Sequence, residues 1–229
     1  MSAVDSVNQT SSFLPSGWAA RLTLTMCNHY RNIPGAAQFL PTWREFIGFD
    51  IPTELPLFAD DVWPKRQGLV LRVQDGRLNA DAMMWGVPCD VPGKRPGARI
   101  KRHITNVRNL TSPFWRSMLA DPARRCLVPF TSFAEPVIGQ GKAEHWFTIK
   151  GRPLAAFAGI WRPTEEGNAF AFLTCEPNPM VAPLHPKAMP VILPEAHYRS
   201  WLTGDWADTQ ALACSYPSQL MEVDSPPHT

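Results

Sequence analysis

Short apolar stretches, separated by turn-forming residues, recur along the chain from residue 68 onward. Turns are indicated by Asp75-Gly76, Gly139-Gln140-Gly141, Lys150-Gly151 and Glu166-Gly167-Asn168. This spacing is typical of an antiparallel sheet or a partly closed barrel. The predicted strands are Gly68 to Val73, Arg124 to Phe130, Trp146 to Ile149, Leu154 to Ile160, Ala169 to Thr174 and Pro190 to Leu193.

Helix-like spacing of apolar residues is less frequent. It occurs from Ala36 to Phe46 and from Pro194 to Leu202, and the second segment begins with a proline followed by Glu195, as a first helical turn often does. The chain of 229 residues is long enough for one well-filled core. We therefore expect an α+β fold: a single domain built on an antiparallel, partly closed β-barrel-like sheet with a few peripheral helices.

The two ends of the chain differ in composition from the middle. Residues 1–25 hold eight Ser or Thr and one basic residue, Arg21, and lack the pattern of a secretory signal. We expect them to be a disordered leader, or an incorrectly assigned start if translation begins at Met26. Residues 26–214 are then the folded domain, and residues 215–229, rich in Ser and Pro, are expected to be a flexible tail.

Some classes of protein are disfavoured by the composition. The longest apolar run, Leu154 to Trp161, is far shorter than the roughly 20 residues that cross a bilayer. Five cysteines, an odd number without CxxC spacing, favour neither a disulfide framework nor a zinc site. No P-loop or Rossmann fingerprint is present. We expect a cytoplasmic, reduced protein with no membrane contact, no metal and no cofactor.

A local concentration of positive charge changes this picture. Residues 94–125 contain nine Lys or Arg, Lys101 and Arg102 among them, against one acidic residue, Asp121. Such a segment is suited to phosphate contacts, and Trp85, Phe114 and Trp115 flank it as a base-stacking surface would require. The alternative is an ordinary solvated face of the protein.

Met26-Cys27 is the pair with the most distinctive chemistry. Initiator methionine is readily removed before a small residue, which would leave Cys27 with a free α-amine beside its thiol. An amine with a pKa of roughly 7.7 to 8.0 attacks an aldehyde to give an imine, and the thiol then closes a five-membered thiazolidine ring. An internal cysteine cannot do this, because its nitrogen is part of an amide. The alternative is a buried structural cysteine.

Five segments in this order resemble the SOS-response-associated peptidase (SRAP) family, whose members protect abasic sites by DNA–protein cross-linking. The resemblance runs from Met26 to about Leu202. The segments are Met26-Cys27-Asn28-His29-Tyr30, similar to M-C-G-R-[YF]; Met84-Trp85-Gly86-Val87-Pro88, similar to W-G-[LI]; Thr105-Asn106-Val107-Arg108, similar to N-A-R; Phe133-Ala134-Glu135, similar to F-[YF]-E; and Leu184-His185 with Met189-Pro190-Val191-Ile192-Leu193, similar to H-x-R-M-P-[VA]-I-L.

The chain departs from the family pattern at several positions. Asn28-His29 stands where Gly-Arg is usual, which removes a cation beside Cys27. Leu110 replaces an acidic residue. The histidine segment is one residue longer, with Lys187 near the position of the family arginine.

The resemblance implies roles for individual residues. It implies Cys27 as nucleophile, Asn106 as a positioning amide, Glu135 as acid or base, and His185 as a second proton-transfer group. The DNA-binding residues that we expect are Arg108, Trp85, Lys101 and Arg102. From their neighbours alone, Glu135 would be an ordinary loop acid and His185 a structural histidine, while for Trp85 both base stacking and a place in the core stay open.

Three functions remain open on this evidence. The first is a monomeric DNA-repair protein that binds abasic sites in single-stranded DNA, forms a thiazolidine cross-link through Cys27, and cleaves on the 3′ side by β-elimination through its imine. The second is a cysteine peptidase or amidase, with self-cleavage exposing Cys27 as an N-terminal nucleophile. The third is a non-catalytic module that binds single-stranded DNA.

Overall fold

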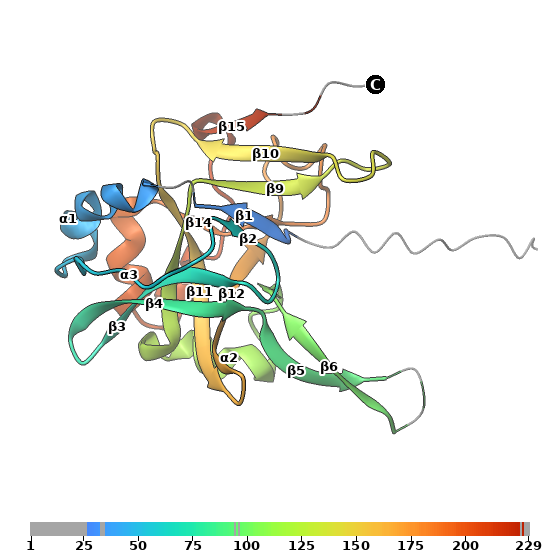
Figure 1. Cartoon of the computed structure of the whole chain (residues 1–229), viewed down its shortest axis with the longest axis horizontal. Coiled ribbons are helices and arrows are strands. Elements are labelled where there is room, and N and C mark those ends of the chain that lie inside the picture. The colour runs from blue at the N-terminus through green and yellow to red at the C-terminus, as the bar shows by residue number, and fades with distance from the viewer. Residues whose placement is uncertain (1–26, 33–34, 94, 96, 225, 227–229) are drawn as a thin grey trace, which may run out of the picture.

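The computed structural model describes residues 27–32, 35–93, 95, 97–224 and 226, and these residues form a closed barrel of five strands with a second sheet beside it (Figure 1). The ring runs in the order β12, β4, β3, β8 and β11, and closes where β11 pairs with β12. Neighbours in the ring are antiparallel except β12 and β4, which are parallel. The barrel strands are β3 (Gln67–Gln74), β4 (Arg77–Trp85), β8 (Arg125–Phe130), β11 (Ala155–Thr164) and β12 (Gly167–Cys175).

The second sheet lies next to the barrel and contains the first described strand of the chain. Its order is β15 (Met221–Asp224), β10 (Glu144–Ile149), β9 (Ser132–Pro136), β1 (His29–Arg31) and β2 (Asp61–Val62). Strand β1 is therefore paired on both sides, with β2 and with β9.

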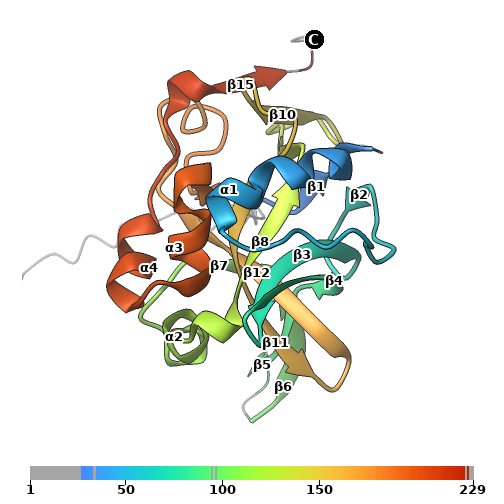
Figure 2. The same cartoon turned by 90° about the vertical axis from the view of Figure 1, so that its left-hand side faces the viewer.

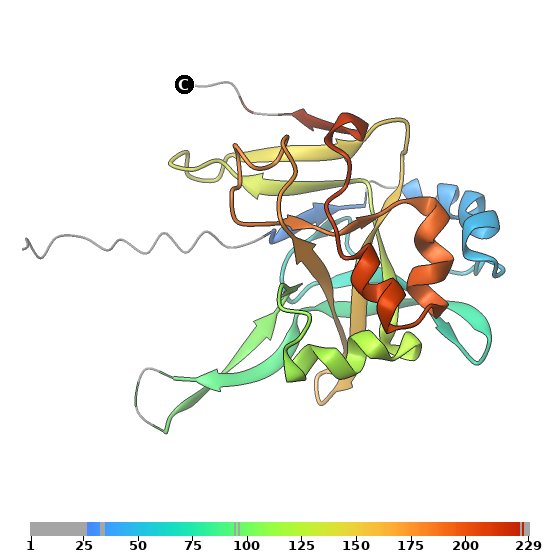
Figure 3. The same ribbon diagram turned by 180° about the vertical axis from the view of Figure 1, so that it is seen from behind.

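The remaining strands form a separate two-stranded sheet or extend the barrel sheet. Strand β5 (Val87–Pro92) and strand β6 (Arg99–Ile104) form a hairpin that projects from the body of the protein (Figures 1 and 3). The short strand β7 (Asn106–Val107) runs parallel to β12, while β13 (Met189–Pro190) and β14 (Ile192–Leu193) pair with β12 and β11.

Short helices cover one side of the barrel, where α1, α3 and α4 lie together (Figure 2). No helix in the described part of the chain is long and apolar enough to cross a membrane. The α-helices are α1 (Arg44–Ile47), α2 (Pro113–Ala120), α3 (Tyr198–Thr203) and α4 (Trp206–Leu212), and the 3₁₀ helices are η1 (Ala36–Trp43), η2 (Pro122–Arg124), η3 (Glu195–His197) and η4 (Ser218–Leu220).

Alternate residues of the barrel strands belong to two separate apolar cores. Leu69 and Leu71 of β3 pack in a core that includes Trp43 and Trp201 from the helices, whereas Val70 between them packs in the second core with Tyr30. This follows from the two-residue period of a strand, which turns successive side chains to opposite faces. Because both faces of β3, β8, β11 and β12 are largely buried, these strands are nearly continuous apolar runs in the sequence.

A glycine in β3 allows the second sheet to approach the barrel closely. A Cβ atom on Gly68 would collide with the hydroxyl oxygen of Tyr30, whose side chain extends from β1 into the second core. The Tyr30 ring packs edge-on against Trp85 and Phe157, at centroid distances of 5.2 and 5.8 Å. The strand that follows Cys27 is thus fixed to the barrel by its own buried side chain.

The predicted fold class is confirmed, and the predicted elements correspond to β3, β8, β10, β11, β12 and the pair β13 and β14. The two predicted helices are each divided, the first into η1 and α1 and the second into η3 and α3. The predicted leader, residues 1–25, lies outside the described residues.

The flexible tail that we expected from residue 215 needs correction. Tyr216 and Met221 are buried, and Met221–Asp224 form strand β15, which pairs with β10. The Ser and Pro residues of this segment sit in the turns that lead to β15, so its composition indicated loops but not their docking on the fold. The folded part extends to at least Asp224.

Met221 provides a direct test of this docked C-terminal strand. The Met221→Ala variant should lower the free energy of unfolding by about 2–5 kcal/mol, the usual cost of truncating a fully buried large apolar side chain. Val223, on the same strand but 37% exposed, is the matched control, and Val223→Ala should change it by less than about 0.5 kcal/mol. Urea unfolding followed by circular dichroism measures both, and equal small effects would contradict the docking of this strand.

Candidate functional site

Cys27 lies immediately before β1 and is held by two polar contacts. Its side chain is buried, with its Sγ 3.8 Å from the carbonyl oxygen of His29. Asn106, the first residue of β7, donates from Nδ2 to the carbonyl oxygen of Cys27 at 3.1 Å. The pairing of β7 with β12 fixes Asn106, so a residue 79 positions away in the sequence orients the Cys27 backbone.

Glu135 and His185 form a fully buried pair beside this cysteine. The His185 Nε2 atom is 3.8 Å from the Glu135 Oε2 atom, and both side chains are inaccessible to solvent. His185 Nδ1 lies 2.8 Å from the carbonyl oxygen of Ala188, which can only accept, so Nδ1 carries a proton. In neutral His185 the lone pair of Nε2 therefore faces Glu135.

Burial controls the protonation of this group. Desolvation raises the pKa of the Glu135 carboxyl well above its usual range, an effect that the Cys27 backbone opposes in part and the negative charge of Glu144 reinforces. Desolvation, followed by the charge of Glu135, raises the pKa of the Cys27 thiol. A thiolate at Cys27 and a carboxylate at Glu135 thus disfavour each other, and the site favours a neutral, protonated Glu135.

Several polar atoms of these residues lack hydrogen-bond partners. Among the described residues, Asn106 Oδ1 and His185 Nε2 are buried without one, and the buried Glu135 carboxyl has no side-chain partner, only the nearby Cys27 backbone. Leaving a buried polar group unpaired costs free energy, and such groups call for a functional explanation. A polar ligand atom between Glu135 and His185 could bond to both, since their separation exceeds a direct hydrogen bond.

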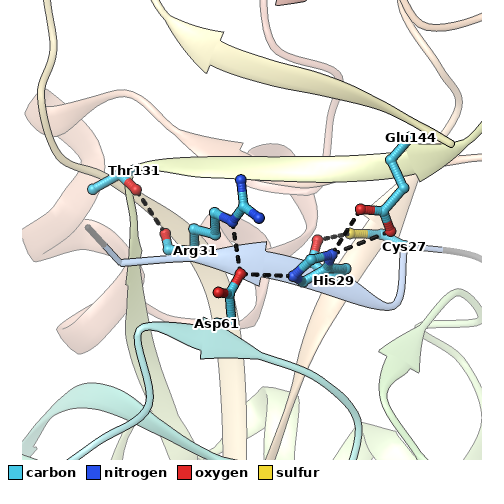
Figure 4. Close-up of polar contacts among 6 residues, drawn as sticks. All are labelled: Cys27, His29, Arg31, Asp61, Thr131 and Glu144. Atoms are coloured by element: carbon cyan, nitrogen blue, oxygen red, sulfur yellow. Dashed lines mark hydrogen bonds and ion pairs between the residues drawn. The ribbon is translucent and has the colours of Figure 1, made fainter. Parts of the chain in front are cut away.

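A second polar cluster surrounds His29, two residues from Cys27 (Figure 4). His29 Nδ1 is 2.9 Å from a carboxyl oxygen of Glu144, and Nε2 is 3.0 Å from Asp61 Oδ1. Only the doubly protonated ring donates to both carboxylates at once. Arg31 also donates to Asp61 at 2.6 Å. The sequence has His29 where the family usually has arginine, and in the structure Glu144 and Asp61 hold this histidine in place.

The structure brings Cys27, Asn106, Glu135 and His185 together, but it separates the residues expected to bind DNA. Trp85 is fully buried, stacks on Phe172 with centroids 5.1 Å apart, and donates from Nε1 to the carbonyl oxygen of Thr105 at 3.1 Å. It has no free ring face for a base in this conformation, so its position matches the alternative, a core residue. Arg108 pairs with Glu176 and donates to the carbonyl oxygen of Cys175 at 2.6 Å.

The basic segment 94–125 is divided among unrelated surroundings. Lys101 and Arg102 are exposed on the β6 strand of the projecting hairpin, where Lys101 pairs with Glu166 at 3.3 Å. Arg125 is fully buried and donates to Gly204, Asp205 and Thr209. The segment therefore does not form one phosphate-binding surface. Lys94 lies outside the described residues.

The comparison with family models identifies the class of protein. The model of the SOS response associated peptidase (SRAP) family matches residues 26–225, so the chain belongs to that family. The family name links its members to the SOS response to DNA damage. A search of curated proteins gave no significant match.

Solved structures share the same fold. A protein from Bordetella bronchiseptica is 24% identical, with a TM-score of 0.66 over 88% of this chain and 100% of its own. A protein from Bacteroides thetaiotaomicron is 19% identical, with a TM-score of 0.63 over 87% of this chain and 91% of its own. A phage-related protein from Bordetella bronchiseptica is 19% identical, with a TM-score of 0.60 over 88% and 95%. At these identities the likeness concerns the fold.

Proposed function

We propose that this protein forms a covalent cross-link to abasic sites in single-stranded DNA through Cys27, once the preceding residues have been removed. The free α-amine of Cys27 attacks the aldehyde of the opened sugar and gives an imine and water. The thiol then adds across the C=N bond, with its proton passing to nitrogen, and closes a thiazolidine ring. The imine also allows β-elimination on the 3′ side, which gives the protein lyase activity.

The observation that carries this proposal is the set of buried polar atoms on Asn106, Glu135 and His185 that lie near Cys27 and have no side-chain hydrogen-bond partner. Opening of the sugar and loss of water each require proton transfer, and positioned acids and bases typically accelerate such steps by about 10²- to 10⁴-fold. A protonated Glu135 supplies a proton to the departing oxygen, and the lone pair of His185 Nε2 accepts one. Asn106 fixes the backbone of the nucleophile.

The second function, an N-terminal cysteine peptidase or amidase, uses the same groups and is favoured by the family name. It is also a route to the active form, because self-cleavage after Met26 would release the α-amine. Incubation of the full-length chain, with Glu135→Ala as a parallel sample, should convert only the wild-type protein to the mass that begins at Cys27. Intact mass spectrometry measures this, and unchanged mass in both samples would argue against self-processing.

The cross-linking reaction is tested with a chain that begins at Cys27 and an oligonucleotide that carries one abasic site. We expect an adduct that withstands a denaturing gel and forms at high as well as low salt, with a mass equal to protein plus DNA minus one water. Simple electrostatic binding of a single strand would instead disappear at high salt and leave no band on the gel. A salt-sensitive complex without a covalent product would support the non-catalytic module.

A further inference from the structure

Trp63 is the one aromatic residue among the exposed large apolar side chains in the described part of the chain. It is 42% exposed and directly follows β2, the strand that pairs with β1. One face of its ring stacks on His29, with centroids 3.7 Å apart and planes at 22°. The ring therefore lies against a residue two positions from Cys27 and still offers surface to solvent.

The ring of Trp63 packs on the His29 side chain, which its own hydrogen bonds hold in place. His29 is fixed by Glu144 and Asp61 through its two nitrogens, and its edge meets Trp146 at a centroid distance of 4.7 Å. Arg31 covers Trp146, with its guanidinium carbon 3.8 Å from the ring centroid. These stacked and paired groups leave Trp63 little freedom to collapse inward.

The backbone at Trp63 is also held in place. Arg66 donates its amide to the carbonyl oxygen of Trp63 at 2.9 Å, with Pro64 and Lys65 between them, and Lys65 has a φ of 70°. Proline at the second position and a positive φ at the third are features of a type II turn. Since a positive φ is unfavourable for lysine, the fold holds this turn against a local cost. Hydrogen bonds of Lys65 and Arg66 with the Trp85 backbone, at 2.8 and 2.9 Å, tie the turn to β4.

The charges near this ring suit a nucleic acid strand. Asp61 pairs with Arg31, and the ring of His29 lies between the carboxylates of Asp61 and Glu144, so both acids already have partners. Lys65 and Arg66 are exposed and form no ion pair with the described residues. An aromatic ring beside free cations is the combination that binds single strands, where the ring stacks on a base and the cations contact phosphates.

We propose that Trp63 is the stacking platform for a nucleobase next to the abasic sugar, and that Lys65 and Arg66 contact the adjoining phosphates. This inference rests on the proposed function, and it assigns to Trp63 the role that the buried Trp85 does not fill. Stacking tolerates any base, so the platform gives affinity without sequence preference.

The test compares two oligonucleotides with one abasic site each, one with adenines on both sides and one with base-free spacers on both sides. For wild-type protein, the DNA concentration that gives half-maximal adduct should be about 10-fold higher with spacers, in line with the loss of one stacked base. Trp63→Ala should require that higher concentration for both DNAs, while Trp63→Phe should keep most of the difference. Leu220→Ala, a substitution of another exposed apolar residue at 45% exposure, is the control and should behave as wild type.

Two outcomes separate this inference from the proposed function. If wild-type protein forms no adduct, the proposed function fails, and stacking is then judged by fluorescence anisotropy with an undamaged single strand, where Trp63→Ala should again bind about 10-fold more weakly. The inference is overturned if folded Trp63→Ala has the same half-maximal DNA concentrations as wild type for both abasic DNAs and the same affinity in anisotropy. This holds whether or not the cross-link forms.

Discussion

Without borohydride, chains that begin at residue 27 and carry Cys27→Ala should form no denaturation-resistant adduct with abasic single-stranded DNA. The variant keeps an α-amine, so the imine still forms and borohydride should trap it, but without sulfur no thiazolidine closes. Wild-type protein should give a stable band with or without borohydride. The comparison separates the contribution of the amine from that of the thiol.

The matched control is Cys126→Ala, because Cys126 is also a buried thiol in the same apolar core as Cys27. Cys126 lies within β8 and its nitrogen is part of an internal amide, so its replacement should leave the adduct intact. A full yield of stable adduct from Cys27→Ala would remove the proposed reaction. Loss of the adduct in both variants would point to a general defect in folding, which circular dichroism would reveal.

Replacement of Glu135 by glutamine is expected to have opposite effects on reaction rate and on stability. Glutamine keeps the shape but transfers no proton, so the rate of adduct formation should fall by about 100-fold or more. The raised pKa of Glu135 means that the folded protein holds a proton that the unfolded chain releases above the ordinary glutamic acid value of 4.5. The free energy of unfolding of the wild type therefore falls as the pH rises from 4.5 toward the raised pKa of Glu135.

This pH-dependent loss should disappear in Glu135→Gln, whose melting temperature at pH 8 should equal or exceed that of wild type. Glu222→Gln, an exposed change on β15, is the control and should alter neither rate nor melting temperature. Single-turnover gels and thermal scans at pH 5 and pH 8 measure the two effects. An unchanged rate together with a lower melting temperature would make Glu135 a purely structural residue.

Much of the barrel could be predicted from the sequence, because β3, β8, β11 and β12 are apolar on both faces and are bounded by clear turns. The turn at Asp75 and Gly76 has positive φ at both positions, which the sequence pair predicts. Strand β4 was missed because polar residues such as Asn79 and Asp81 interrupt its apolar pattern. Helix α2 and strand β6 were missed because their residues were interpreted as a charged segment.

The proximity of Cys27, Asn106, Glu135 and His185 could be predicted because these residues belong to motifs with recognisable spacing. Asp61, Trp63, Glu144 and Trp146 could not, since they meet His29 only through the pairing of β1 with β2 and of β9 with β10. No local pattern marks such cross-strand contacts. Trp85 was predicted as a stacking residue because its position in the sequence does not reveal that its ring is buried in the second core.

The pairing of β1 on both edges bears on how a newly made chain end would behave. The first residues of a chain are usually poorly ordered, so the α-amine of a terminal residue has no fixed position. Here the hydrogen-bonded pairing of β1 begins at His29, and the Asn106 side-chain amide donates to the carbonyl oxygen of Cys27. A terminus at Cys27 would thus be immobilised by folding itself, so that little entropy remains to be lost when the amine meets an electrophile.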